Sequence, residues 1–261
     1  EGGAVTANGE VNITNTKFNS NTAENAGGAM YLPGITKQIY NTGENGEMQL
    51  VKTIYTDAVI KDSTFENNSV TNNKASDIYS NYYIDSFGEE TAEEYYKTTP
   101  QGGAIYSGGN LSIDNTVFKG NSAIKVVETN SSNENGTINS LDQEGKGGAI
   151  YNTGEASEEI SYYPDLSVRN STFENNKSTE GGAIYNEGTI KEFKGNTFTD
   201  NSALYEYKSE RSHSYVDNGI TVSSNSSQKS HSGSGGAIYS KNGDLNIENN
   251  TFERNTAAYG G

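Results

Sequence analysis

The chain has 261 residues and a formal net charge of −16, from 34 acidic and 18 basic side chains. Only 31% of its residues are apolar, whereas an ordinary globular domain has roughly 45–50%. The acidity excludes a simple nucleic-acid binder, because such a protein needs a basic face against the phosphates. No run of about 18 apolar residues occurs, so we expect no membrane insertion by this segment as a helix.

Two short motifs alternate along the chain. The first is Gly-Gly-Ala followed by an apolar residue, and it begins at Gly2, Gly27, Gly102, Gly147, Gly181 and Gly235. A Tyr follows five of these copies, at Tyr31, Tyr106, Tyr151, Tyr185 and Tyr239. The second motif is Phe-x-x-Asn, with its rings at Phe18, Phe65, Phe118, Phe173, Phe198 and Phe252 and its amides at Asn21, Asn68, Asn121, Asn176, Asn201 and Asn255. Six copies of each motif in alternation indicate a repeat fold, not the disorder that the composition alone would suggest.

The residues before each Phe predict a short β-strand. In five copies apolar residues stand seven and five positions ahead of the Phe, as Leu111 and Ile113 do before Phe118. Apolar residues two apart lie on one face of a strand. The copy before Phe198 departs from this pattern, because one extra residue separates Ile190 from Phe193.

The spacing of the motifs predicts an all-β fold, a parallel β-helix (a solenoid). Without insertions, Gly-Gly precedes Phe by 16 or 17 residues, and Phe precedes the next Gly-Gly by 8 or 9. A coil of about 25 residues with two or three short strands is too short for a propeller blade. Coils that stack at about 4.8 Å place equivalent residues above one another. We therefore expect the Phe rings to stack inside the column.

The same stacking assigns places to the other motif residues. The motif Asn residues are expected at corners, in left-handed backbone conformation and hydrogen-bonded to the neighbouring coil. We place the apolar residue after each Gly-Gly-Ala inside the column. The following Tyr then faces outward as a surface stripe, unless the alternation runs the other way.

Insertions occur at two points of the coil, and they leave a single domain spanning 1–261. They occupy about 31–57, 69–101, 122–146, 151–165 and 202–234. Alternating apolar residues around a polar turn suggest a hairpin over 36–55. The run Ala75-Ser76-Asp77-Ile78-Tyr79 imitates Gly-Gly-Ala-Ile-Tyr and suggests a degenerate coil. Both chain ends fall within a repeat, so we expect either a segment of a longer protein or columns that stack end to end.

The paired motifs resemble the polymorphic outer-membrane protein repeat, known from chlamydial autotransporter passengers and from adhesin-like surface proteins of bacteria and archaea. The compact copy from Gly181 to Asn201 is similar throughout its length, and the resemblance covers all six coils but little of the insertions. It implies a right-handed parallel β-helix that is exported, displayed on a cell surface and often involved in adhesion.

No arrangement of residues indicates a catalytic or metal site. Asp62, Asp114, Asp165, Asp200 and Asp244 lie at different registers, without the converging carboxylates that polysaccharide cleavage needs. His213 and His231, both in the insertion 202–234, match no compact metal-ligand motif. We predict no enzyme activity and no cofactor; bound calcium remains an alternative at the acidic insertion residues Glu89, Glu90, Glu93 and Glu94.

Tyrosines cluster in the insertions, beside acidic residues. These candidate ligand contacts are Tyr82, Tyr83, Tyr95, Tyr96, Tyr162, Tyr163, Tyr205 and Tyr207. Aromatic rings with polar neighbours suit sugar stacking or protein contacts. The alternative is that the rings lie against the outer wall of the column and shield it.

The sequence leaves three functional hypotheses. The first is a non-enzymatic, extracellular, adhesin-like stalk on the cell surface, which presents its insertions to a protein or glycan of a host or neighbouring cell. The second is a structural subunit of a fibre or sheath, assembled by end-to-end stacking of columns. The third is a polysaccharide-active enzyme with its site along one wall.

Overall fold

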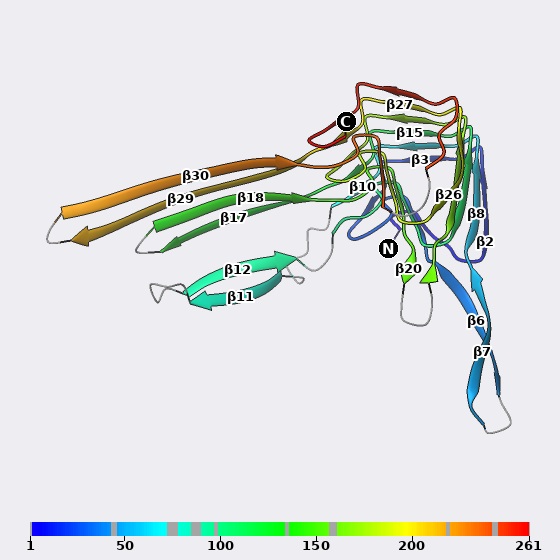
Figure 1. The fold of residues 1–261 in the computed structure, drawn as a ribbon, viewed down its shortest axis with the longest axis horizontal. Helices are drawn as coiled ribbons and strands as arrows, with labels where there is room; N and C mark the ends of the chain where they lie inside the picture. The colour runs from blue at the N-terminus through cyan, green and yellow to red at the C-terminus, as the bar shows by residue number, and fades with distance from the viewer. Residues whose placement is uncertain are drawn as a thin grey trace.

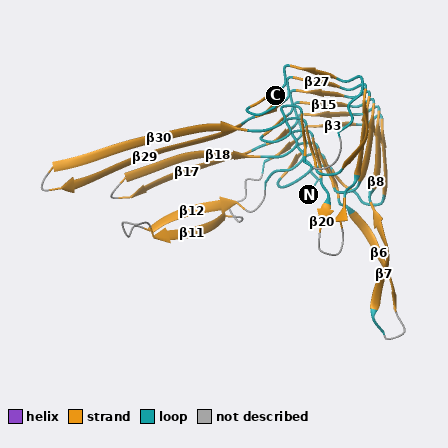
Figure 2. Cartoon of the chain, in the orientation of Figure 1, coloured by secondary structure: helices purple, strands orange, loops and turns teal. Residues whose placement is uncertain are grey.

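The computed structural model describes residues 2–42, 46–71, 78–84, 90–96, 99–133, 136–156, 161–217, 220–241 and 245–260. Only the backbone is described for 36, 78–84, 90–96, 127–133, 136–142, 155–156, 161, 213–217 and 220–221. The regular elements in this part of the chain are β-strands (Figure 2). None of the described residues forms a helix that could cross a membrane.

Four parallel sheets form the walls of one column (Figure 1). The first wall, after Gly-Gly-Ala, contains β1 (Val5–Thr6), β5 (Met30–Leu32), β13 (Ile105–Ser107), β19 (Ile150–Asn152), β25 (Ile184–Asn186) and β31 (Ile238–Ser240). The second contains β2 (Glu10–Thr14), β8 (Asp57–Lys61), β14 (Asn110–Asp114), β22 (Asp165–Arg169) and β26 (Thr189–Lys194). The third contains β3 (Lys17–Asn19), β9 (Thr64–Glu66), β15 (Val117–Lys119), β23 (Thr172–Glu174), β27 (Thr197–Thr199) and β32 (Thr251–Glu253). The fourth contains β4 (Thr22–Ala23), β10 (Ser69–Val70), β16 (Ser122–Ala123), β24 (Lys177–Ser178), β28 (Ser202–Ala203) and β33 (Thr256–Ala257).

In the described part of the chain, five antiparallel hairpins project from the column at the predicted insertions (Figure 1). They are β6 (Ile35–Thr42) with β7 (Met48–Tyr55), β11 (Ile78–Ile84) with β12 (Glu90–Tyr96), β17 (Lys125–Asn133) with β18 (Gly136–Glu144), β20 (Glu155–Ala156) with β21 (Ser161–Tyr162), and β29 (Tyr205–Asp217) with β30 (Ile220–Ser232). Ile78 and Tyr79 pair antiparallel with Tyr96 and Tyr95. The degenerate coil predicted there is therefore wrong for these two residues, and 75–77 lie outside the described residues.

The predicted parallel β-helix is confirmed by the register of its walls. Phe118 lies opposite Phe65 on one side and Phe173 on the other. All six Phe rings stack in one file, with ring centroids 4.6 to 5.0 Å apart. The apolar residues after Gly-Gly-Ala, such as Ile150 and Ile184, lie in the same buried cluster. The core is thus a set of parallel files that run along the column.

The Gly-Gly corners explain why two glycines are needed. Gly102 has a φ of +64°, the left-handed region that favours glycine. At Gly103 a Cβ atom would lie 2.0 Å from the carbonyl oxygen of Gly148 in the next coil. The first glycine therefore makes the turn, and the second lets two coils approach.

The motif Asn residues form a buried ladder. The backbone N–H and the side-chain amide of Asn68 both donate to Oδ1 of Asn121, at 3.0 and 2.9 Å. The same amide donates to the carbonyl of Phe18 in the preceding coil. The left-handed conformation predicted for these Asn residues is wrong. Positive φ occurs one residue earlier, as at Asn67, because the chain turns there and leaves the Asn side chain pointing inward.

Two copies of the repeat depart from the regular pattern. A β-bulge in β26 accommodates the extra residue of the fifth copy, so that Leu166 pairs with Ile190 but Val168 pairs with Phe193. In the sixth copy no strand forms over 245–247, and Leu245 and Ile247 are exposed, contrary to the alternating pattern. Among the described residues, this coil pairs with a neighbouring coil on one side.

Candidate functional site

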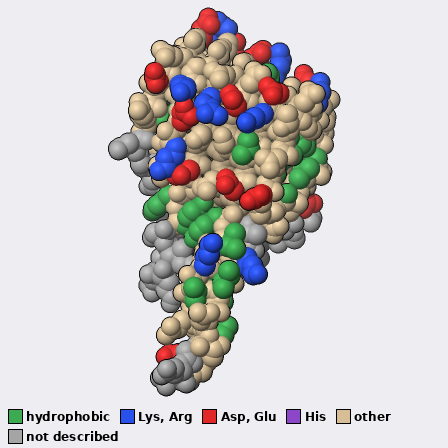
Figure 3. Space-filling model, turned by 90° about the vertical axis from the view of Figure 1, so that its right-hand side faces the viewer, with side chains coloured by type: hydrophobic (Ala, Val, Ile, Leu, Met, Phe, Trp, Pro, Cys, Tyr) green, Lys and Arg blue, Asp and Glu red, His purple; other side chains and the backbone are tan. Residues whose placement is uncertain are grey.

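Charged residues on the outer face of the column are arranged as ion pairs between coils. Lys17 lies 2.8 Å from Glu66, and Arg169 lies 3.1 Å from Glu192. Hydrogen bonds from Lys17 and from Lys194 hold the pKa values of Glu66 and Glu192, respectively, below their usual range. Acidic and basic side chains are interspersed over this surface (Figure 3). Such exposed pairs are worth little individually.

The described aspartates among those considered for catalysis each have a separate partner. Asp62 accepts from Asn115, Asp165 pairs with Lys191, and Asp200 binds Arg254 through both carboxylate oxygens. Asp114 accepts from the amide of Asn170, and Asp244 lies outside the described residues. The described aspartates are thus spread over the coils and do not converge on one cleft.

The tyrosines that follow Gly-Gly-Ala form an outward-facing file on the first wall. Tyr31 and Tyr106 stack with their ring centroids 4.7 Å apart, and the file continues through the next three copies. The predicted outward direction holds, but the rings are not freely exposed. Tyr151 is 5% exposed and Tyr185 is 2% exposed. Both of their hydroxyl groups donate to Glu187, which holds the file together.

These buried rings predict a loss of stability at alkaline pH. Burial raises the pKa of Tyr162 to about 12 and raises the pKa values of Tyr151 and Tyr185 further. The unfolded chain releases these protons near pH 10, before the folded chain does. The free energy of unfolding should therefore fall as the pH rises above about 10. Urea midpoints measured from pH 8 to 11.5 test this; Tyr185→Phe should reduce the slope, and a flat profile for the parent protein would contradict it.

The insertion tyrosines fall into separate groups. Tyr162 stacks on Tyr55 and donates to Asn110, so it lies against the column as the shielding alternative predicts. Tyr163 is exposed, and Tyr205 and Tyr207 are half-buried on β29. The other four candidates lie on the backbone of β11 and β12, with side chains outside the described residues: Tyr82, Tyr83, Tyr95 and Tyr96. The structure thus places described candidates at two different insertions.

Two hairpins from different insertions join into one four-stranded antiparallel sheet, which we call the blade (Figure 1). Its strand order is β17-β18-β29-β30. Strands β18 and β29 pair from Leu141 opposite Lys208 to Gly136 opposite His213. The β11–β12 hairpin projects from the same side of the column. Sequence reasoning predicted the insertions but missed this pairing, because no motif links 122–146 with 202–234.

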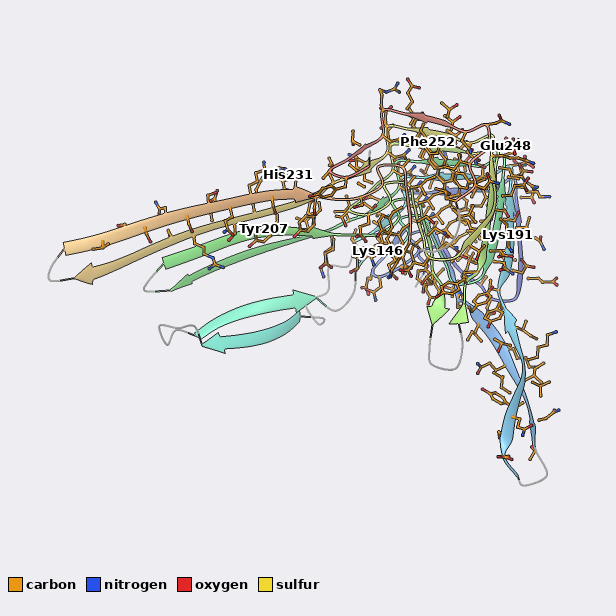
Figure 4. The ribbon with its side chains drawn as sticks, in the orientation of Figure 1. Lys146, Lys191, Tyr207, His231, Glu248 and Phe252 are labelled. Carbon is orange, nitrogen blue, oxygen red and sulfur yellow. The ribbon has the colours of Figure 1, made fainter. Side chains whose placement is uncertain are left out.

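The charged residues of the blade form a small network around Glu206. Lys208 and Lys229 lie 3.0 and 3.2 Å from its carboxylate, and their hydrogen bonds lower the pKa of Glu206. His231 lies 3.8 Å from the same carboxylate (Figure 4). His213 lies opposite Ser224, seven residues from His231 along β30, which is roughly 24 Å. The two histidines therefore do not share a metal site.

Among the side chains that the structure describes, no group of three or more His, Asp or Glu residues could hold a metal ion. The side chains proposed for the calcium alternative are not among those that the structure describes. Glu90, Glu93 and Glu94 lie on β12, of which only the backbone is described, and Glu89 lies outside the described residues.

A second polar ladder was missed in the sequence. It uses the residue two positions before each motif Phe, where every copy has Thr, Ser or Asn. The N–H of Thr116 donates to Oγ of Ser171, and the N–H of Ser171 donates to Oδ1 of Asn196. These bonds satisfy backbone groups at the corner between the second and third walls. The sequence signal for this ladder was the polar residue that recurs two positions before each motif Phe.

Comparison with known proteins finds one family model that matches the chain, described as the Chlamydia polymorphic membrane protein repeat. It covers residues 62–108, 115–153, 170–187 and 197–241, which is more than half of the chain. Each stretch contains one Phe-x-x-Asn motif and the Gly-Gly-Ala motif that follows it. No curated protein and no solved structure matches the chain.

Proposed function

Because the chain belongs to the Chlamydia polymorphic membrane protein repeat family, we propose that it is a non-enzymatic, adhesin-like protein whose column holds binding hairpins away from the cell. The family indicates an outer-membrane or surface protein. The observation that carries the finer proposal is the group of three hairpins on one side of the column, two of which share the blade (Figure 1).

The column suits the role of a support. Its Phe file and its Asn ladder repeat in successive coils, so neighbouring coils hold one another in register. Insertions at fixed corners leave these files intact, which lets the hairpins differ while the column stays the same. The net charge of −16 keeps neighbouring columns apart in solution.

The composition of the blade suits binding to a protein or glycan of a host or neighbouring cell. Nine of the 26 residues in β29 and β30 are Ser, and the strands also carry Tyr205, Tyr207 and Tyr215. Binding surfaces such as antibody loops combine Ser and Asn, which adapt their hydrogen bonds, with Tyr as a rigid aromatic anchor. The half-buried Tyr205 and Tyr207 occupy the part of β29 nearest the column.

Two deletions test the proposal. Removing 124–144 joins Ala123 to Gly145, and removing 204–232 joins Ala203 to Gly233; both junctions copy the short corner 179–180 of the coil between them. We expect each deletion to lower binding to cells or to immobilised host proteins and glycans at least tenfold, because each one removes half of the blade.

The matched control removes the β6–β7 hairpin, which leaves the column in another direction (Figure 1). Deleting 35–55 joins Gly34 to Thr56, whose backbone groups are already hydrogen-bonded at 2.9 Å. This variant should bind as the parent does, with an unchanged β-type circular dichroism spectrum. Full binding by both blade deletions would contradict the adhesin proposal.

A fibre or sheath subunit is the second candidate function. The last described coil presents a cleft of about 370 Å³ lined by Ile238, Leu245, Ile247 and Phe252. The first coil of a second copy carries the same Phe and Asn files and would continue the ladders across this face. Association through the ends does not need the blade, so the deletion variants would still sediment as assemblies if this candidate were correct.

A further inference from the structure

A cleft lies at the root of the blade, where its two hairpins leave the column. The hairpins start from β16 and β28, and the coil between them, which contains β24, has only the short corner 179–180. Their roots are therefore two coils apart, about 9.6 Å. Further out β18 and β29 pair directly. The space left at the root is a cleft of about 290 Å³.

The short corner forms the floor of the cleft. Thr179 is buried there, and its hydroxyl donates to the carbonyl of Gly145 at 2.7 Å. The root of β18 contributes Glu144 on one side, and β29 contributes Tyr205 on the other. Because the floor and both sides belong to hydrogen-bonded strands and corners, the cleft is built into the fold.

A file of side chains along the column completes the lining. Lys146, Glu180, Ser234 and Tyr259, each just before a Gly-Gly pair, follow one another in successive coils. Three steps of about 4.8 Å give this file a length of about 14 Å. The ammonium of Lys146 lies 4.9 Å from the ring centre of Tyr185 and 3.9 Å from Glu180 (Figure 4). The lysine is thus held against the column.

The chemistry of this lining suits a sugar. The carboxylates of Glu144 and Glu180 accept hydrogen bonds from hydroxyl groups, and each has more acceptor positions than its contacts with Thr99 and Lys146 use. Tyr205 and Tyr259 supply aromatic surface on which the apolar face of a sugar ring can pack. The volume lies near the lower end of ligand pockets, about 300–1,000 Å³. It matches one or two sugar rings.

We propose that the cleft at the root of the blade binds an uncharged glycan. This inference rests on the adhesin-like function and assigns it a ligand class and a site. An acidic glycan would meet two carboxylates on a chain of net charge −16 and would be repelled. The glycan chain would run along the file from Lys146 to Tyr259, with its hydroxyl groups toward Glu144 and Glu180.

Titration of the full chain with a panel of neutral and sialylated di- to tetrasaccharides tests the proposal. At least one neutral oligosaccharide should bind, and Tyr259→Ala and Glu180→Gln should each weaken binding at least tenfold. Tyr259 is 67% exposed, so its ring can be removed without opening the core. Tyr40→Ala is the matched control, because this exposed tyrosine lies on the β6–β7 hairpin, and its binding should equal that of the parent.

The proposal would be overturned by no binding of any neutral oligosaccharide at millimolar concentration, by unchanged binding in both cleft variants, or by tighter binding of the sialylated sugars. Binding to peptides but not sugars would overturn it as well. Cell binding that depends on the blade without any glycan binding would leave the adhesin function standing and remove this site. Glycan binding at the cleft without cell attachment would support the site but contradict the adhesin function.

Discussion

Replacing Phe118 by Ala is expected to lower the free energy of unfolding by about 3–5 kcal/mol, the usual cost of removing a buried Phe side chain. The ring is fully buried and stacks on Phe65 and Phe173, at 4.9 and 4.8 Å. Its loss would leave a cavity that the backbone ladders on both sides prevent from closing. Urea unfolding followed by circular dichroism measures the effect.

The chain offers a matched control in the same file. Phe252 stacks on Phe198 only and is 43% exposed. Phe252→Ala removes the same atoms from a half-covered position, and we expect it to cost about 1–2 kcal/mol. Equal losses for the two variants would show that stacking on both faces does not carry the stability of the column.

Replacing Asn121 by Ala is expected to cost about 2–6 kcal/mol, because two buried N–H donors of Asn68 would lose their acceptor at about 1–3 kcal/mol each. The backbone N–H and the side-chain amide of Asn68 both donate to Oδ1 of Asn121. Asn68 and Asn121 are fully buried, so neither donor contacts solvent in the parent protein. Urea midpoints against the parent protein give the loss.

Two further variants separate hydrogen bonding from side-chain volume. Asn121→Asp keeps the shape but sets a buried carboxylate against the carbonyl of Phe65 and Oδ1 of Asn176. It should be less stable than Asn121→Ala at pH 7 and recover as the pH falls, because a protonated carboxyl can donate. Asn12→Ala, at an exposed position of β2, should change stability by less than about 0.5 kcal/mol. If Asn121→Ala left the free energy of unfolding unchanged, the ladder would not stabilise the column.

Both predictions concern the part of the molecule that local sequence specifies well. Each coil contacts its neighbours through the same positions, so a repeated residue type reports a repeated environment. The Phe spacing therefore predicted the stacked rings, and the copy whose spacing departs from the pattern before Phe193 is the one that contains a β-bulge. The backbone of the motif Asn residues was mispredicted, because spacing alone does not tell which of two adjacent corner residues makes the turn.

The candidate site was harder to predict from the sequence than the column was. Tyr162 and Tyr205 stand in equally polar insertions, yet the first stacks on Tyr55 and the second lines the cleft. Composition could not separate them, because the difference depends on what lies beside each hairpin. The cleft residues Glu144 and Tyr259 are more than 100 positions apart and share no motif.

The sequence by itself determined the architecture of the column: its period, its stacked Phe and Asn files, and the corners at which the insertions leave it. Those features repeat every coil, and stacking turns a sequence repeat directly into a spatial one. Only the tertiary structure decided that two hairpins separated by a short-cornered coil bend together into one blade and leave a cleft at its root. That pairing depends on the direction in which each hairpin leaves the column, a geometric property that no repeated residue records.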